Sequence, residues 1–105
     1  MNILYIRTST VEQNSERQSV NKKDYNLLIE DKCSGTIPFF ERSGGKKIMK
    51  LLSNDSIKSL SVHTIDRLGR NLLDILNTIK HFTEHKVNII FKQQGLNTLD
   101  YEGNE

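Results

Sequence analysis

The chain has few of the residues that mark several classes of protein. Its 105 residues include no tryptophan, one proline and one cysteine, Cys33. A single cysteine excludes an intramolecular disulfide, so nothing indicates an oxidising compartment. No run of eighteen apolar residues is present, and the apolar start of the chain is too short for a signal peptide. We therefore expect a cytoplasmic protein.

Several motifs of known chemistry are also missing. The sequence contains no P-loop, no Gly-x-Gly-x-x-Gly and no Cys/His cluster with zinc spacing. It also contains no Gly-x-Ser-x-Gly elbow and no evident His–Asp pair for a hydrolase triad. We therefore expect neither a metal site nor a cofactor.

Composition indicates one mildly basic domain. Hydrophobic residues make up 35% of the chain, charged residues make up 27%, and the net charge is +2. A chain of this length can bury a real core as a single domain, residues 1–105. The charge permits binding to nucleic acid without arguing for it, since DNA-binding domains are usually more basic.

The beginning of the chain organises the rest. The apolar run 3–6 predicts a buried parallel strand. A capping-box pattern that starts at Thr10 then predicts a helix over 11–23. In open α/β sheets, ligands bind where strands end and helices begin, so Arg7 and Ser9 lie where an anion would be held. The alternative is that Ser9 only caps the helix and Arg7 is solvated.

The remaining pattern alternates strands and helices. Strands are expected at 25–30, 59–65 and 87–91, and helices at 46–53 and 68–82. Residues 31–45 contain three glycines and the only proline, which predicts a long loop, and 93–105 are expected to form a polar tail. This order predicts an α/β fold: a single domain with a mostly parallel sheet of four to five strands flanked by helices.

A second strand-to-helix junction carries two arginines. Asp66 is a natural N-cap, and Arg67 and Arg70 are expected in the first helical turn. Positive charge is unfavourable at the positive end of a helix dipole, unless an anion is bound there. Guanidinium groups hold phosphate oxygens in bidentate fashion, so the pair favours phosphate binding. His63, on the preceding strand, is expected to be packed.

Parallel strands bring both junctions to one edge of the sheet. We expect six side chains to converge there: Arg7, Ser9, Asp31, Asp66, Arg67 and Arg70. A serine among arginines favours metal-free attack on a phosphodiester.

Four blocks of residues carry a resemblance to a known family. They are Tyr5-x-Arg7-x-Ser9-Thr10-x-x-Gln13 with Gln18 following, Asp31-x-x-Ser34-Gly35, Arg42 ahead of an apolar helix, and Ile65-Asp66-Arg67-Leu68-Gly69-Arg70. In this order and spacing they resemble the catalytic domain of serine recombinases, the resolvases and DNA invertases.

The resemblance implies a reaction and roles for the residues. Ser9 would attack a DNA phosphodiester, forming a 5′-phosphoserine link and freeing a 3′-hydroxyl, and strand exchange and rejoining would need no cofactor. Asp66 would orient arginines or assist proton transfer. The residues expected to neutralise the phosphate are Arg7, Arg67, Arg70 and Arg42. The residues expected to support the site or bind phosphate are Tyr5, Thr10, Gln13, Gln18 and Asp31.

The resemblance also implies partners. Residues 1–105 would be the catalytic domain without the family's long C-terminal helix and DNA-binding domain, and would be inactive alone. Double-stranded DNA would be the substrate, and the full-length protein would form a dimer, and a tetramer in the active synapse. Two alternatives stay open: a non-catalytic oligomerisation or regulatory module of the same fold, and an unrelated phosphate-binding α/β domain. The latter would require a glycine-rich phosphate loop, which the sequence lacks.

Overall fold

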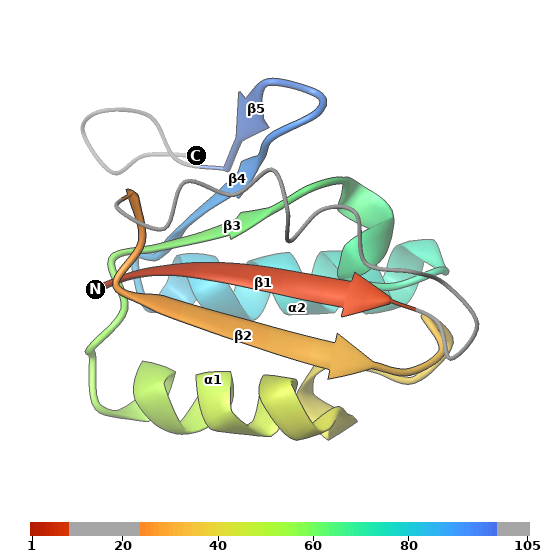
Figure 1. Ribbon diagram of the computed structural model, residues 1–105, viewed down its shortest axis with the longest axis horizontal. Helices are drawn as coiled ribbons and strands as arrows, with labels where there is room; N and C mark the ends of the chain where they lie inside the picture. Colours follow the sequence, from red (N-terminus) through yellow and green to blue (C-terminus); the bar gives the residue numbers. More distant parts are fainter. Residues whose placement is uncertain (9–23, 99–105) are drawn as a thin grey trace.

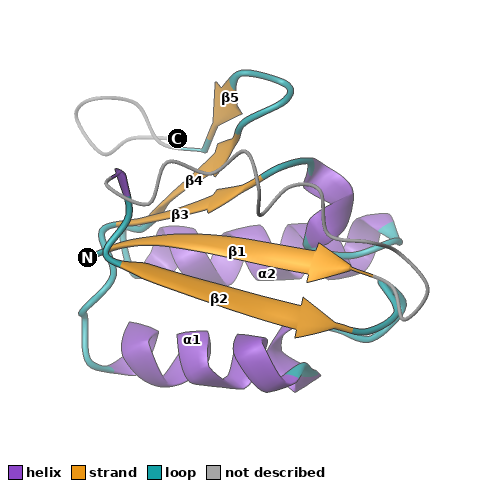
Figure 2. Ribbon diagram, viewed as in Figure 1, coloured by secondary structure: helices purple, strands orange, loops and turns teal. Residues whose placement is uncertain are grey.

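The computed structural model describes residues 1–8 and 24–98 (Figure 1). The strands are β1 (Asn2–Thr8), β2 (Leu27–Lys32), β3 (Ser59–Val62), β4 (Asn88–Phe91) and β5 (Leu96–Asn97). The helices are α1 (Ser43–Ser53) and α2 (Leu72–Glu84), with two 3-10 helices at Phe39–Glu41 and Ile65–Arg67. Figure 2 distinguishes the helices from the strands by colour. The expected helix over 11–23 lies outside the described residues.

One sheet holds all five strands, in the order β2-β1-β3-β4-β5. The first four are parallel, and β5 runs antiparallel to β4. The expected mostly parallel α/β sheet is therefore confirmed. The expectation of a polar tail from residue 93 is wrong for Leu96–Asn97, which form strand β5. There Gly95 adopts a positive φ of 68°, which turns the chain back, and the Thr98 hydroxyl accepts a hydrogen bond from the Ile89 N–H at 3.0 Å.

Both helices cover the same face of the sheet. Tyr5 of β1 packs in one buried cluster with Ile48 of α1 and Phe82 of α2. Leu4 and Ile6 are also buried, and they point to the opposite face because side chains alternate along a strand. β1 is therefore buried on both faces, as its apolar run predicts, while α1 runs beside the β2 edge and α2 behind the sheet (Figure 1).

The segment expected as an irregular loop over 31–45 is largely structured. Phe39 is buried and makes edge-on contacts with Tyr5 at 4.8 Å and with Phe82 at 5.9 Å between ring centroids. Helix α1 begins at Ser43, three residues before the expected start. A Cβ on Gly45 would lie 1.7 Å from the Phe39 carbonyl oxygen. The glycine therefore lets the first turn of α1 pack against the 3-10 helix.

Two boundaries near the second junction also differ from expectation. β3 ends at Val62, three residues early, and His63 is exposed rather than packed. Helix α2 begins at Leu72, because Asn71 caps it by accepting a hydrogen bond from the Asp74 N–H at 2.9 Å. The expectation that Asp66 is the N-cap is therefore wrong, and the stretch that follows β3 forms a 3-10 turn instead.

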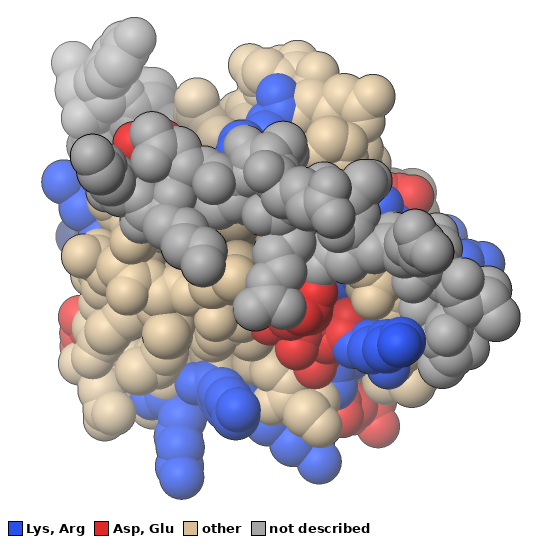
Figure 3. All heavy atoms as spheres, in the orientation of Figure 1, with Lys and Arg blue, Asp and Glu red and all other residues tan. Residues whose placement is uncertain are grey.

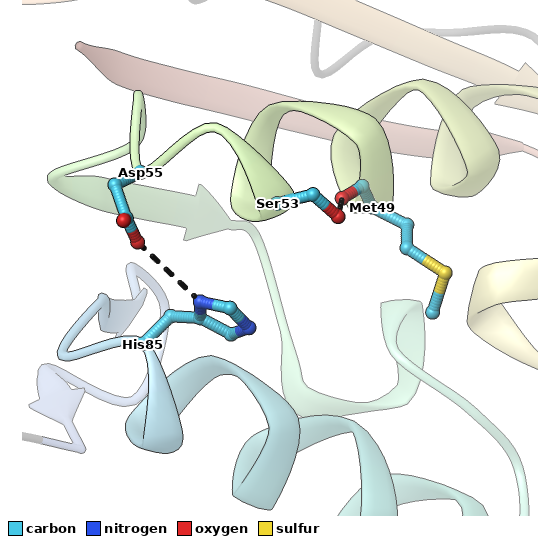
Figure 4. Close-up of polar contacts among 4 residues, drawn as sticks. All are labelled: Met49, Ser53, Asp55 and His85. Atoms are coloured by element: carbon cyan, nitrogen blue, oxygen red, sulfur yellow. Dashed lines mark hydrogen bonds and ion pairs between the residues drawn. The ribbon is translucent and has the colours of Figure 1, made fainter.

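The carboxyl ends of the two helices lie close together. His85, the C-cap of α2, approaches Asp55 beyond α1, with 3.6 Å between Nδ1 and Oδ1 (Figure 4). This contact carries an ionic component when the imidazole is protonated. Among the described helices, none is long and apolar enough to span a bilayer.

Candidate active site

The candidate site lies where β1, β2 and β3 end. Arg7 is paired in register with Asp31 of the neighbouring strand. Asp31 is thus within β2 rather than after it, since the strand runs two residues further than expected. The 3-10 turn that follows β3 approaches the same edge, because Arg42 donates to the Arg67 carbonyl oxygen at 2.6 Å.

Gly35 lies between two arginine side chains. A Cβ at this position would lie 2.8 Å from Nε of Arg70 and 3.3 Å from Cζ of Arg7. Arg7 is buried, with 2% of its surface exposed, and its Nη1 donates to the Cys33 carbonyl oxygen at 2.9 Å. Arg70 is exposed. The two guanidinium groups beside this glycine, one buried and one exposed, concentrate positive charge suited to a phosphate.

The other two predicted residues of the second junction belong to a short 3-10 turn. Asp66 is exposed and accepts a hydrogen bond from the Thr64 hydroxyl. Arg67 is half-buried at the end of this turn, and Arg70 follows before α2 begins. Both arginines were expected in the first turn of the long helix. They instead precede this helix, and Asn71 caps the N-terminus of α2.

Three further predicted residues form a buried hydrogen-bonded group, which we call the buried triad: Tyr5, Asp31 and Arg42. Arg42 donates from Nη1 to the Tyr5 hydroxyl at 3.1 Å, and that hydroxyl donates to Asp31 Oδ2 at 2.8 Å. The other oxygen of Asp31 accepts from the Gly44 N–H in the first turn of α1, at 2.7 Å. Arg42 occupies the N-cap position of α1 but makes no side-chain cap bond. Asp31, in strand β2, supplies this cap instead.

The environment of Tyr5 keeps its phenol protonated. Burial raises the pKa of Tyr5 far above its usual value, and the nearby Asp31 carboxylate adds to the increase, while Arg42 opposes it. Tyr5 therefore acts in this site as a hydrogen-bond donor and acceptor, not as a base.

The predicted residues thus divide into three sets. Those at the strand-end edge are Arg7, Asp66, Arg67 and Arg70. Those in the buried triad are Tyr5, Asp31 and Arg42. Those outside the described residues are Ser9, Thr10, Gln13 and Gln18. Two glycines also belong to the site. In the sequence, Gly35 is recognisable only as part of a motif, and nothing marks Gly44. Each glycine is needed because of side chains that are distant in sequence: Arg7 and Arg70 for Gly35, and Ile29 and Asp31 for Gly44.

Comparison with known proteins identifies the family. The family model "Resolvase, N terminal domain" matches residues 2–105. The DNA-invertase of Escherichia phage P1 is 34% identical over 90 residues, which cover 84% of this chain and 46% of that protein. The Transposon Tn2501 resolvase of Escherichia coli is 31% identical over 91 residues, covering 81% and 46%. The chain therefore spans about half the length of these curated relatives.

Solved structures share the fold. The N-terminal catalytic domain of TP901-1 integrase superposes with a TM-score of 0.74 at 21% identity, covering 98% of this chain and 85% of that one. The first open reading frame of transposon ISC1904 from Sulfolobus solfataricus superposes with a TM-score of 0.70 at 24% identity, covering 97% and 73%. With the family match over residues 2–105, the chain belongs to the resolvase N-terminal domain family.

Proposed function

We propose that this chain is the catalytic domain of a site-specific DNA recombinase that acts on double-stranded DNA in the cytoplasm. The observation that carries the proposal is the pair of arginines around Gly35, at the end of the strand that leads to Ser9. Arg67 in the adjacent turn adds a third guanidinium to this edge. Such groups stabilise the charge that develops on a phosphate during displacement.

The proposed chemistry is a transesterification. The Ser9 oxygen attacks the phosphorus and loses its proton, a phosphoserine bond forms, and the bond to the 3′ oxygen breaks. The 3′ oxygen leaves with a proton as a hydroxyl, and the reverse reaction rejoins strands after exchange. One phosphodiester replaces another at each step, so no external energy source is needed. Arg7, Arg67 and Arg70 hold the phosphate, and Asp66 orients them or assists proton transfer.

The charge of the surface supports a polyanionic substrate. The exposed side chains Lys46, Lys47 and Lys50 lie on α1, whose sequence contains no acidic residue. Basic side chains accordingly gather along the α1 side of the molecule (Figure 3). Helix α1 begins beside the strand-end edge, where its Gly44 N–H donates to Asp31. We infer weak, sequence-independent DNA binding by this chain alone.

We also propose that the active form is a homo-oligomer of a longer protein, in which further residues supply DNA recognition. Helix α2 carries three leucines on one exposed stripe: Leu72, Leu73 and Leu76 are 70%, 67% and 52% exposed. Large apolar side chains exposed together are typical of an interaction surface. Because the stripe starts next to the arginine turn, a second subunit bound there would lie beside the site.

A covalent-trapping experiment tests the function. The longer protein is incubated with a supercoiled plasmid that carries the DNA flanking its own gene, and the reaction is quenched with denaturant. Protein attached to DNA 5′ ends is expected with the unchanged protein and with Ser53→Ala, and it should be lost with Ser9→Ala. Ser53 is a matched control because it is exposed and its hydroxyl donates to the Met49 carbonyl oxygen at 3.1 Å, within α1 (Figure 4).

The same experiment distinguishes a catalytic domain from a non-catalytic regulatory module of the same fold. A regulatory module of this fold would bind the plasmid yet form no adduct with any variant. Adducts that persist in Ser9→Ala would instead assign the nucleophile to another residue.

A further inference from the structure

The hydrogen bonds of Arg42 all remain within the protein. Arg42 is buried, with 2% of its surface exposed. Its acceptors, with their distances, are Ile37 O at 2.9 Å, Arg67 O at 2.6 Å, Tyr5 OH at 3.1 Å, and Gly35 O and Leu68 O at 3.4 Å each. A guanidinium has five N–H donors, so five acceptors engage its whole capacity. No donor is left for a phosphate unless one of these bonds breaks.

The acceptors come from the two segments that carry the site. Gly35 and Ile37 belong to the segment after β2, and Gly35 is the residue that separates Arg7 from Arg70. The other backbone acceptors belong to the turn after β3, at Arg67 and Leu68. Arg42 therefore connects the glycine between two arginines to the backbone of a third.

The rest of the buried triad fixes Arg42 itself. Its Nη1 is held by Tyr5, whose ring packs edge-on against Phe39 at 4.8 Å, and Tyr5 is held in turn by Asp31. Asp31 is bound to the first turn of α1 through Gly44. The carboxylate also supplies the negative charge that a buried guanidinium needs nearby. The triad thus anchors the two loops to β1, β2 and α1.

We propose that Arg42, held in place by Tyr5 and Asp31, is a positioning residue of the recombinase site rather than a group that contacts the DNA phosphate. This inference rests on the proposed function, because it concerns how the arginines that bind the phosphate are held. It predicts that loss of the triad slows the cleavage step while DNA binds as before. Misplacement of reacting groups by about 1 Å costs up to roughly 100-fold in rate.

Two measurements on the longer protein test the proposal. The first is the rate of adduct formation at saturating plasmid DNA, with the DNA concentration for half-maximal rate. Tyr5→Phe removes one hydroxyl and keeps the ring on Phe39. It is expected to lower the maximal rate roughly 10- to 100-fold and leave the half-saturating concentration unchanged. The control is Tyr25→Phe, which removes a hydroxyl outside the triad and should leave both values unchanged. Circular dichroism at the assay temperature checks that each variant is folded.

The second measurement is the salt dependence of DNA affinity. A side chain that contacts a phosphate contributes about one to the slope of log affinity against log salt concentration. Arg70→Met is expected to reduce the slope by about one, whereas Arg42→Met should leave it unchanged. If Arg42→Met does not fold, the maximal rate of adduct formation by Tyr5→Phe still tests the positioning role.

The outcomes distinguish the two proposals. Adducts with the unchanged protein, together with a wild-type maximal rate in folded Tyr5→Phe, would overturn the positioning role and leave the function standing. A reduced salt slope in Arg42→Met would do the same, by showing a direct phosphate contact. Failure of the unchanged protein to form any adduct would overturn the proposed function, and the positioning role with it.

Discussion

At the scale of single residues, the absence of a side chain at position 35 matters as much as the arginines around it. In Gly35→Ala, the new methyl would lie 2.8 Å from Nε and 2.9 Å from Cγ of Arg70, so this side chain must move. We expect adduct formation to slow roughly 10- to 100-fold, with the far-ultraviolet circular dichroism spectrum retained. A wild-type rate in this variant would show that Arg70 is free to rearrange without cost.

The control for this prediction is the same substitution at another glycine. A Cβ at Gly95 meets nothing within 4 Å, although its φ of 68° strains an alanine. Gly95→Ala should therefore lose some stability while its cleavage rate stays unchanged, which separates backbone strain from crowding at the arginines.

Alkali should destabilise the protein through Tyr5. An unfolded chain ionises this phenol at its usual pKa of about 10, but burial raises the pKa in the folded protein far above that value. The contribution of Tyr5 to stability is therefore complete below about pH 10 and is lost as the pH rises beyond it, by about 1.4 kcal/mol per pH unit. Urea unfolding at several pH values on both sides of about pH 10 should show this decline in the unchanged chain and a smaller one in Tyr5→Phe. Parallel declines would contradict the prediction.

At the scale of elements, local patterns predicted the four parallel strands and the long helix but not β5, and tertiary contacts decided where these elements end. The apolar run of β1 and the apolar spacing along α2 are visible in sequence because burial imposes a period on them. The start of α1 is not visible, because its cap is supplied by Asp31, thirteen positions before Gly44. The start of α2 was misplaced because Asp66 and Asn71 are both good caps, and only packing selects between them.

The candidate site divides in the same way. Strand-end arginines such as Arg7 could be predicted, because parallel strands end at one edge. The division between exposed and buried arginines could not, since Arg42 and Arg70 look alike in sequence. What separates them is the set of carbonyl oxygens around Arg42, which exists only once two loops have folded together.

The cap of α1 allows a stability prediction for Gly44. In Gly44→Ala, the new methyl would lie 2.6 Å from Cγ2 of Ile29 and 2.7 Å from Oδ2 of Asp31. Such crowding costs about 1–3 kcal/mol, which exceeds the gain of up to about 1 kcal/mol that alanine brings to a helix. Urea unfolding should therefore show a net loss of stability. Ser43→Ala, at the exposed neighbouring position, should change it little, and equal stability of both variants would contradict the crowding.

At the scale of the whole molecule, the described surface carries two different interaction features near one edge. The basic side chains of α1 suit a polyanion, whereas the leucines of α2 suit an apolar partner. Both helices cover the same face of the sheet and begin near the arginines, so DNA and a second subunit could approach the site together.

Self-association through α2 is the testable part of this arrangement. Leu72 and Leu76 lie one helical turn apart and are 70% and 52% exposed, so replacing both with serine removes apolar surface without opening the core. Sedimentation equilibrium of the unchanged chain should show association at high concentration, because pairing these stripes buries them from water. Leu72→Ser with Leu76→Ser should shift the equilibrium to monomer, whereas Leu27→Ser, 38% exposed on β2, should not. Association that survives the double substitution would move the interface elsewhere. A chain that stays monomeric throughout would remove the second copy as the partner of this stripe.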